Sequence, residues 1–166
     1  MKSELVVLGL DPGTRRFGWG VVRRNGTRLV HVAHGVIALK EGPLATRLVE
    51  IERVLDEVVR LHGPTQAGVE GIFFHKDAQA AAKLGHARGV ALLVCGRASL
   101  EVFEYAPARV KRTVAAHGQA QKAQVAQMVR VILGLPSPPA SDAADALAIA
   151  ITHLQGSRLM AQRRGA

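Results

Sequence analysis

The sequence predicts an α/β fold in which helices flank a mixed β-sheet. Short apolar runs come first, at residues 5–10, 18–23 and 29–39, and Asn25-Gly26 between the last two is typical of a hairpin turn. Segments with helical spacing then alternate with two further apolar runs. A meander of strands followed by alternating helices and strands is expected to form a mixed sheet. Hydrophobic residues make up 48% of the 166 residues, which is enough for one core.

The first strand and the first long helix have clear boundaries. Residues 5–10 end at the turn signal Asp11-Pro12-Gly13, so we expect a central, buried strand. In the helix that follows the meander, apolar residues recur at steps of three and four, which places them on one face: Leu44, Leu48, Ile51, Leu55 and Val58. The sequence His62-Gly63-Pro64 marks the end of this helix.

The rest of the chain is expected to alternate strands and helices. The expected elements are a strand at 67–70, a helix at 78–98, a strand at 100–103, helices at 107–117 and 120–133, and a stiff linker at 136–139. A last helix is expected to begin with Ser141 as its N-cap and to run to about Gln155. We therefore expect one domain over residues 1–155 and a short, frayed basic tail over residues 156–166.

The charge and the cysteine content limit the class of protein. Lys and Arg number 22 against 13 Asp and Glu, so the net charge of +9 favours contact with nucleic acid, an anionic membrane or an acidic partner. The membrane alternative is weak, because no apolar stretch approaches the ~20 residues of a spanning helix and the N-terminus lacks the pattern of a signal peptide. The single cysteine, Cys95, lies in an apolar run and is expected to be a buried side chain in a cytoplasmic protein. The histidines form no metal-ligand spacing.

Four acids are the candidate catalytic and metal-binding residues: Asp11, Glu70, Asp142 and Asp145. Asp11 and Glu70 each end an expected strand, at the edge of the sheet where sites of α/β folds are found. Asp142 and Asp145 are three residues apart at the start of a helix and share one face. Each acid alone has an ordinary explanation, as a turn residue, a loop residue or a partner of the helix dipole. Together, in a cationic chain, they predict magnesium-dependent cleavage of a polyanion.

Several segments, taken in order, resemble one family. They are residues 8–13, 69–70, 83–91, 103–106, 110–111, 121–122, 128–130 and 142–150. Through these segments the chain resembles the RuvC family of bacterial Holliday-junction resolvases, and the resemblance runs from about residue 5 to residue 155 with few gaps.

The resemblance implies a ribonuclease H-like fold and a specific activity. A family member is expected to act as a homodimer and to cut a four-way DNA junction by paired symmetrical nicks during recombination and repair. The positions that match the family's metal-binding acids are Asp11, Glu70, Asp142 and Asp145. Two Mg²⁺ ions per site are expected, with Mn²⁺ as a substitute, because one ion can activate water while the second stabilises the leaving oxygen. The branch-migration proteins RuvA and RuvB are implied as partners by the family alone.

Three further residues match DNA-contacting positions of the family. Lys111 and Lys122 match lysines that bind phosphate near the site, and their alternative is a solvated helix face. Phe73 matches an aromatic wedge that stacks on a base at the junction centre, and its alternative is a place in the core. Gly71 and Asp77 depart from the family pattern, in which a polar residue and an asparagine are common.

The helix expected at 78–98 has a smooth face of small residues: Ala78, Ala81, Ala82, Gly85 and Gly89. Glycine inside a helix costs about 1 kcal/mol relative to alanine, so close approach of another element is the physical reason to keep it. This face packs either within the subunit or against a second copy of the chain. Spacing alone does not decide between them.

Other classes of protein fit the sequence less well. Residues 10–14 also resemble the first phosphate loop of the actin, hexokinase and sugar-kinase ATPases, but the chain lacks the length and the second phosphate loop of that class. A DNA-binding protein without catalysis would be expected to have lost its metal ligands. Another nuclease of the ribonuclease H-like superfamily, acting on RNA hybrids or other branched DNA, is the closest competitor, and the matches at 83–91 and 142–150 argue against it.

Overall fold

A five-stranded mixed sheet forms the centre of the computed structural model, which describes residues 4–71 and 77–164, with side chains up to residue 157. The strand order is β3-β2-β1-β4-β5. The strands are β1 Leu5–Asp11, β2 Arg16–Asn25, β3 Arg28–Ala38, β4 Gln66–Glu70 and β5 Glu101–Tyr105. The first three strands pair antiparallel, while β4 is parallel to β1 and β5 is parallel to β4. The predicted mixed sheet is therefore confirmed.

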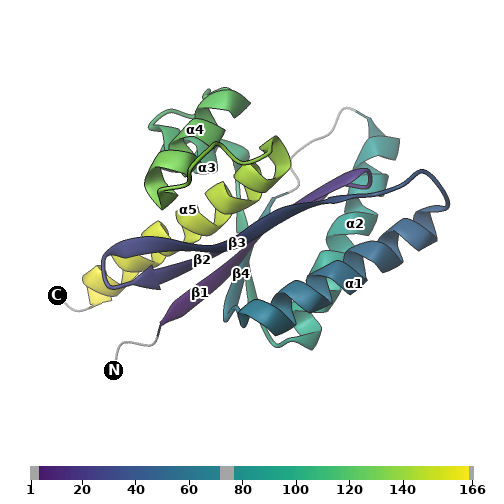
Figure 1. Ribbon diagram of the computed structural model, residues 1–166, viewed down its shortest axis with the longest axis horizontal. Helices are drawn as coiled ribbons and strands as arrows, with labels where there is room; N and C mark the ends of the chain where they lie inside the picture. The colour runs from purple at the N-terminus through teal and green to yellow at the C-terminus, as the bar shows by residue number, and fades with distance from the viewer. Residues whose placement is uncertain (1–3, 72–76, 165–166) are drawn as a thin grey trace.

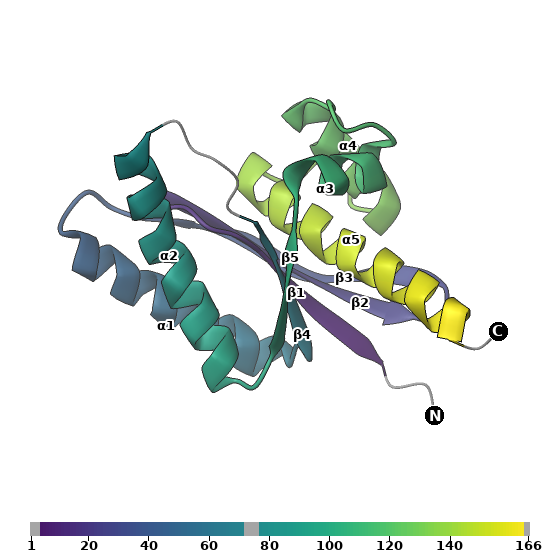
Figure 2. The ribbon, with the colours of Figure 1, turned by 180° about the vertical axis from the view of Figure 1, so that it is seen from behind.

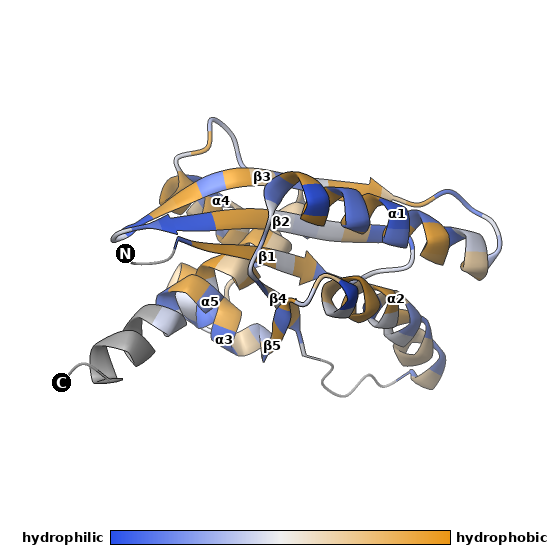
Figure 3. Cartoon of the chain, turned by 90° about the horizontal axis from the view of Figure 1, so that it is seen from below, coloured by the Kyte–Doolittle hydropathy of each residue, from blue (hydrophilic) through white to orange (hydrophobic). Residues whose placement is uncertain are grey.

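Helices cover both faces of this sheet (Figures 1 and 2). The helices are α1 Leu44–His62, α2 Ala78–Arg97, α3 Pro107–Ala115, α4 Lys122–Leu133 and α5 Ser141–Arg164. Helices α1 and α2 lie on one face, and α5 lies on the other with α3 and α4 packed against it. Strand β1, coloured orange over most of its length in Figure 3, is central and buried as predicted.

Local signals set several boundaries where they were expected. Gly63 ends α1 in the left-handed conformation at φ 54°, and its N–H donates to the carbonyl of Val59 at 3.0 Å. Gly26 turns the β2–β3 hairpin at φ 61°. Asp77 caps α2, because its carboxylate accepts the N–H groups of Gln79 and Ala80. Both bonds go to the same oxygen, Oδ1, which an asparagine also has, so the departure at Asp77 leaves the start of α2 intact.

The last helix differs from the prediction at both ends. It begins at Ser141 itself, since the N–H of Ala144 donates to the carbonyl of Ala140 at 2.8 Å, so Ser141 is not the N-cap. It also continues to Arg164, well beyond the expected end at Gln155. Arg24 of β2 donates both to the carbonyl of Leu154 and to the Ser157 hydroxyl. This contact holds α5 against the sheet around Gly156, where the sequence suggested a stop.

Helix α5 lies unusually close to the strands beneath it. A Cβ atom added at Gly9 of β1 would collide with the carbonyl oxygen of Ala146, and one added at Gly18 of β2 would collide with that of Asp142. Alanines on the facing side of α5 are almost completely buried: Ala143, Ala146 and Ala150. Glycine opposite alanine thus allows the backbones to approach, which brings the start of α5 down onto the edge of the sheet.

Cys95 belongs to the inner side of α2 and is buried in the core, as predicted. Burial raises the pKa of its thiol to about 11, so the thiol stays protonated at neutral pH. Among the helices of the described residues, none is both long and apolar enough to cross a membrane.

Candidate active site

The sheet and α5 bring the predicted acids to one edge of the molecule. Asp11 is the last residue of β1 and Glu70 the last residue of β4, and these two strands are paired neighbours that run parallel, with Leu10 opposite Val69. Their carboxylates therefore leave the sheet at the same edge. Asp142 and Asp145 come from the first turns of α5, where the backbone of Asp142 lies directly against Gly18 of β2. The structure thus places all of the predicted acids at one end of the fold.

Electrostatics shows that these carboxylates interact. The pKa of Asp11 is raised to about 8, chiefly because burial disfavours its charge and then because of the negative charges of Asp145, Glu70 and Asp142. The pKa of Asp145 is also raised, mainly by burial, with a contribution from Asp142. Carboxylates that raise one another's pKa form a cluster that an added cation would stabilise.

Two cations contact the acids of α5. Arg16 Nε donates to Asp142 Oδ2 at 2.7 Å, and Lys122 Nζ lies 3.5 Å from Asp145 Oδ2. The positive charges of Lys122 and Lys111 both lower the pKa of Asp145. Lys122 therefore contacts the acidic cluster and Lys111 acts on it through its charge, while their binding of phosphate stays a prediction.

Arg16 is a residue of this site that the sequence analysis missed. It stands five positions after Asp11 and begins β2, which is the antiparallel neighbour of β1. A basic residue just after the Asp11-Pro12-Gly13 turn was a usable signal, because the turn returns the chain past the end of β1. The contact with Asp142 could not be foreseen, since it depends on where α5 lies.

The residue types fit a divalent metal, although no ready ligand set is formed. Carboxylate oxygens are the ligands that Mg²⁺ prefers, and mutual repulsion among them is relieved by a bound cation. Within residues 4–71 and 77–164, no group of three or more His, Cys, Asp or Glu side chains is already arranged to hold an ion. One carboxylate oxygen of Asp142 contacts Arg16 and one of Asp145 lies near Lys122, so a bound metal ion would compete with these cations for the two acids.

A buried hydrogen-bonded chain supports the site from behind. Tyr105 of β5 is the register partner of Glu70, and its carbonyl accepts the N–H of Gly71 at 2.9 Å. The Tyr105 hydroxyl is 2.6 Å from His153 Nδ1 on α5, and His153 Nε2 is 2.8 Å from Gln66 Oε1 on β4. The chain ties β4, β5 and α5 together, and these elements carry three of the acids. The sequence has no local signal for it.

The predicted wedge, Phe73, lies outside the described residues. Its role therefore stays a prediction. Gly71, which departs from the family pattern, ends the described segment that follows Glu70.

Comparison with known proteins shows the family of the chain. The family model "Crossover junction endodeoxyribonuclease RuvC" matches residues 7–153. The chain belongs to the RuvC family. A RuvC from Sorangium cellulosum is 57% identical over 152 residues, covering 91% of this chain and 85% of the relative, and one from Azorhizobium caulinodans is 48% identical over 161 residues, covering 96% and 95%.

A solved RuvC structure confirms the fold. Thermus thermophilus RuvC, solved in complex with a Holliday junction substrate, superimposes with a TM-score of 0.87 at 38% identity, covering 93% of this chain and 96% of that one. The predicted ribonuclease H-like class, a mixed sheet flanked by helices, is therefore confirmed. Membership of the RuvC family also sets aside the ATPase alternative.

Proposed function

We propose that this chain resolves four-way DNA junctions by paired, symmetrical, metal-dependent nicks in recombination and repair. The activity is the one by which its family is named, crossover junction endodeoxyribonuclease. The observation that carries the proposal is the convergence of Asp11, Glu70, Asp142 and Asp145 in a chain of net charge +9, where burial and then the charges of the other three acids raise the pKa of Asp11 to about 8. Such a cluster on a cationic protein suits a metal ion that faces a DNA phosphate.

The side chains of this site divide the chemistry among them. Two Mg²⁺ ions, for which Mn²⁺ is the expected substitute, would be held by Asp11, Glu70, Asp142 and Asp145. When bound, these ions supply an activated water and stabilise the leaving oxygen. Lys111 and Lys122 are placed beside Asp145, where their charges can bind the phosphate and offset the charge of the transition state. The chain from Tyr105 through His153 fixes β5 against α5.

A homodimer is the proposed active form, and the outer side of α2 supports it. The subunit buries Ala87, Ala91 and Val94 on the inner side of this helix. A Cβ atom at Gly85 or Gly89 would meet no heavy atom of another described element within 4 Å, so packing against the described part of the subunit does not explain these glycines. Leu93, one turn beyond Gly89, is 54% exposed. Sedimentation that shows only monomer at micromolar concentration would remove this part of the proposal.

The family also suggests partners and a compartment. RuvA and RuvB are proposed as branch-migration partners on the same junction. A reducing cytoplasm is the proposed location, because the free thiol of Cys95 fits it.

Cleavage of synthetic substrates tests the function. Labelled four-way junction, linear duplex and RNA–DNA hybrid would be incubated with Mg²⁺ and either wild type or Asp11→Asn. We expect nicks in the junction alone, lost in Asp11→Asn while junction binding persists, because the isosteric amide removes a metal ligand and leaves the fold intact. Cleavage of the hybrid instead would indicate another nuclease of the superfamily, and tight binding with no cleavage would indicate a structural DNA-binding protein.

Phe73→Ala tests the predicted wedge. We expect it to slow cleavage of a junction with fully paired arms more than it weakens binding, because unstacking of a base is needed for cutting. Gel-shift and single-turnover assays on the same junction measure the two effects. An equal loss in both would contradict the wedge role.

A further inference from the structure

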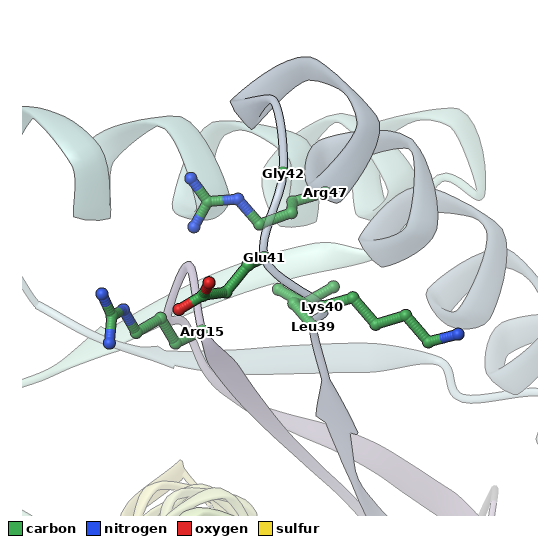
Figure 4. A pocket seen from close by; sticks show the side chains of 6 residues that line it. All are labelled: Arg15, Leu39, Lys40, Glu41, Gly42 and Arg47. Carbon is green, nitrogen blue, oxygen red and sulfur yellow. The ribbon is translucent and has the colours of Figure 1, made fainter.

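A basic pocket lies next to the active site on the α1 side of the sheet. It is a hollow of about 430 Å³ lined by Arg15, Leu39, Lys40, Glu41, Gly42 and Arg47. Arg15 belongs to the turn after Asp11, residues 39–42 connect β3 to α1, and Arg47 lies in the first turn of α1 (Figure 4). Because Arg16, the next residue after Arg15, contacts Asp142, the same turn borders both the acids and this pocket.

Two guanidinium groups dominate the pocket. Arg47 Nη1 donates to the carbonyl of Thr14 at 2.9 Å, which holds its side chain beside the turn. Its Nε atom is buried and has no hydrogen-bond partner among the described residues. Arg15 is exposed, and within the described part of the chain its side chain has no hydrogen bond or ion pair. Two guanidinium groups with unused donors, one of them held in place by Thr14, are suited to bind a phosphate.

Glu41 is the acid that faces these cations. Its carboxylate points between the side chains of Arg15 and Arg47 in Figure 4, whereas Lys40 extends away from them. No ion pair within 4 Å joins Glu41 to a described basic residue, so its charge partly offsets the guanidinium groups without occupying their donors.

The start of α1 adds to the positive potential. Pro43 at the N-cap makes no side-chain hydrogen bond, and the first turn of the helix contains no acid. The free N–H groups and the dipole of α1 therefore act beside Gly42, which lines the pocket. With Arg15 and Arg47, this arrangement favours a phosphodiester.

We propose that this pocket binds a backbone phosphate of the DNA strand that passes the active site, through Arg15 and Arg47, and that Glu41 competes with that phosphate. The inference rests on the proposed function, because it names a subsite for the same DNA. The proposal predicts that removing a positive charge and removing a negative charge from this pocket change junction affinity in opposite directions. Loss of Arg15 weakens junction binding, and loss of the Glu41 charge strengthens it.

Junction binding by Asp11→Asn protein, used as the inert parent, tests the proposal. Fluorescence anisotropy of a labelled four-way junction would be measured over a series of salt concentrations. The proteins compared are the parent and two double variants, in which Arg15→Gln or Glu41→Gln is combined with Asp11→Asn. At ~0.1 M salt we expect about fivefold weaker binding for Arg15→Gln, with the slope of log K against log salt reduced by about 1, and a few-fold tighter binding for Glu41→Gln.

Matched controls lie on the same helix, away from the pocket. Arg60→Gln and Asp56→Asn make the same charge changes, and Arg60 is ~20 Å along the α1 axis from Arg47. Unchanged thermal midpoints exclude misfolding. If Arg15→Gln and Glu41→Gln behave like these controls, or shift binding in the same direction, the pocket proposal is wrong. If the parent itself does not bind the junction, the proposed function fails first, so the two failures are distinguishable.

Discussion

Asp11 couples the chemistry of the site to the stability of the metal-free protein. Its pKa is raised to about 8 by burial and by the charges of Asp145, Glu70 and Asp142, whereas an unfolded Asp titrates near pH 4. Between these values the folded state keeps a proton that the unfolded state has lost. The free energy of unfolding therefore falls as the pH rises from about 4 to about 8, by at most ~1.4 kcal/mol per pH unit from this group.

The first prediction is that Asp11→Asn removes this pH dependence. In EDTA, the substituted protein should be as stable as wild type near pH 4 and more stable by a few kcal/mol near pH 8, because the amide has no charge to bury. Urea unfolding across this pH range measures the difference. Asp56→Asn, an exposed acid of α1, serves as the control and should leave the wild-type dependence unchanged. Parallel pH profiles for wild type and Asp11→Asn would contradict the shift.

The second prediction concerns Arg16, whose guanidinium competes with a metal ion for Asp142. Arg16→Gln should tighten Mn²⁺ binding by about 2- to 5-fold, the size expected for loss of one exposed ion pair. Isothermal titration of the DNA-free protein measures this affinity independently of cleavage. Arg15→Gln is the control. It removes the same charge from the preceding residue, whose side chain makes no ion pair with a described residue. Equal affinities for the two variants would show that the Arg16–Asp142 pair does not restrain the site.

At the scale of elements, the distance between α5 and the sheet sets the geometry of the acids. The third prediction is that Gly18→Ala lowers junction cleavage at least ~10-fold and destabilises the fold by about 1–3 kcal/mol, because its Cβ would collide with the carbonyl of Asp142 and lift the start of α5. Single-turnover cleavage and urea unfolding measure the two effects. Gly96→Ala, whose Cβ meets open space near the end of α2, is the control. Normal cleavage by Gly18→Ala would contradict this account.

Elements whose signals are local could be predicted from the sequence. The strand ahead of Asp11 and the helix stop at Gly63 each follow from residues that are neighbours in the chain, and the acids could be selected because each stands at the end of an expected strand or the start of an expected helix. The full length of α5 could not be predicted, because it depends on Arg24 reaching Leu154 and Ser157 from another element. Likewise, the Tyr105–His153 contact and the Arg16–Asp142 pair join residues far apart in sequence, and only the packed fold brings them together.

At the scale of the whole molecule, the charge distribution sets how the protein meets DNA. The chain has a net charge of +9, while Asp11, Glu70, Asp142 and Asp145 gather at one edge of the sheet beside Arg16, Lys111 and Lys122. The basic residues can neutralise phosphates on either side of the site. Binding is therefore expected to weaken steeply with added salt.

A supercoiled plasmid that extrudes a four-way cruciform tests the central claim most directly. Two symmetrical nicks across the junction convert the circle into a linear product, whereas a single nick only relaxes it. We predict linear product in Mg²⁺ from wild type, none in EDTA and none from Asp145→Asn, since the acids of α5 are proposed to act together with Asp11 at one metal site. Relaxed circles as the final product, or cleavage that persists in EDTA, would contradict a paired, metal-dependent resolvase.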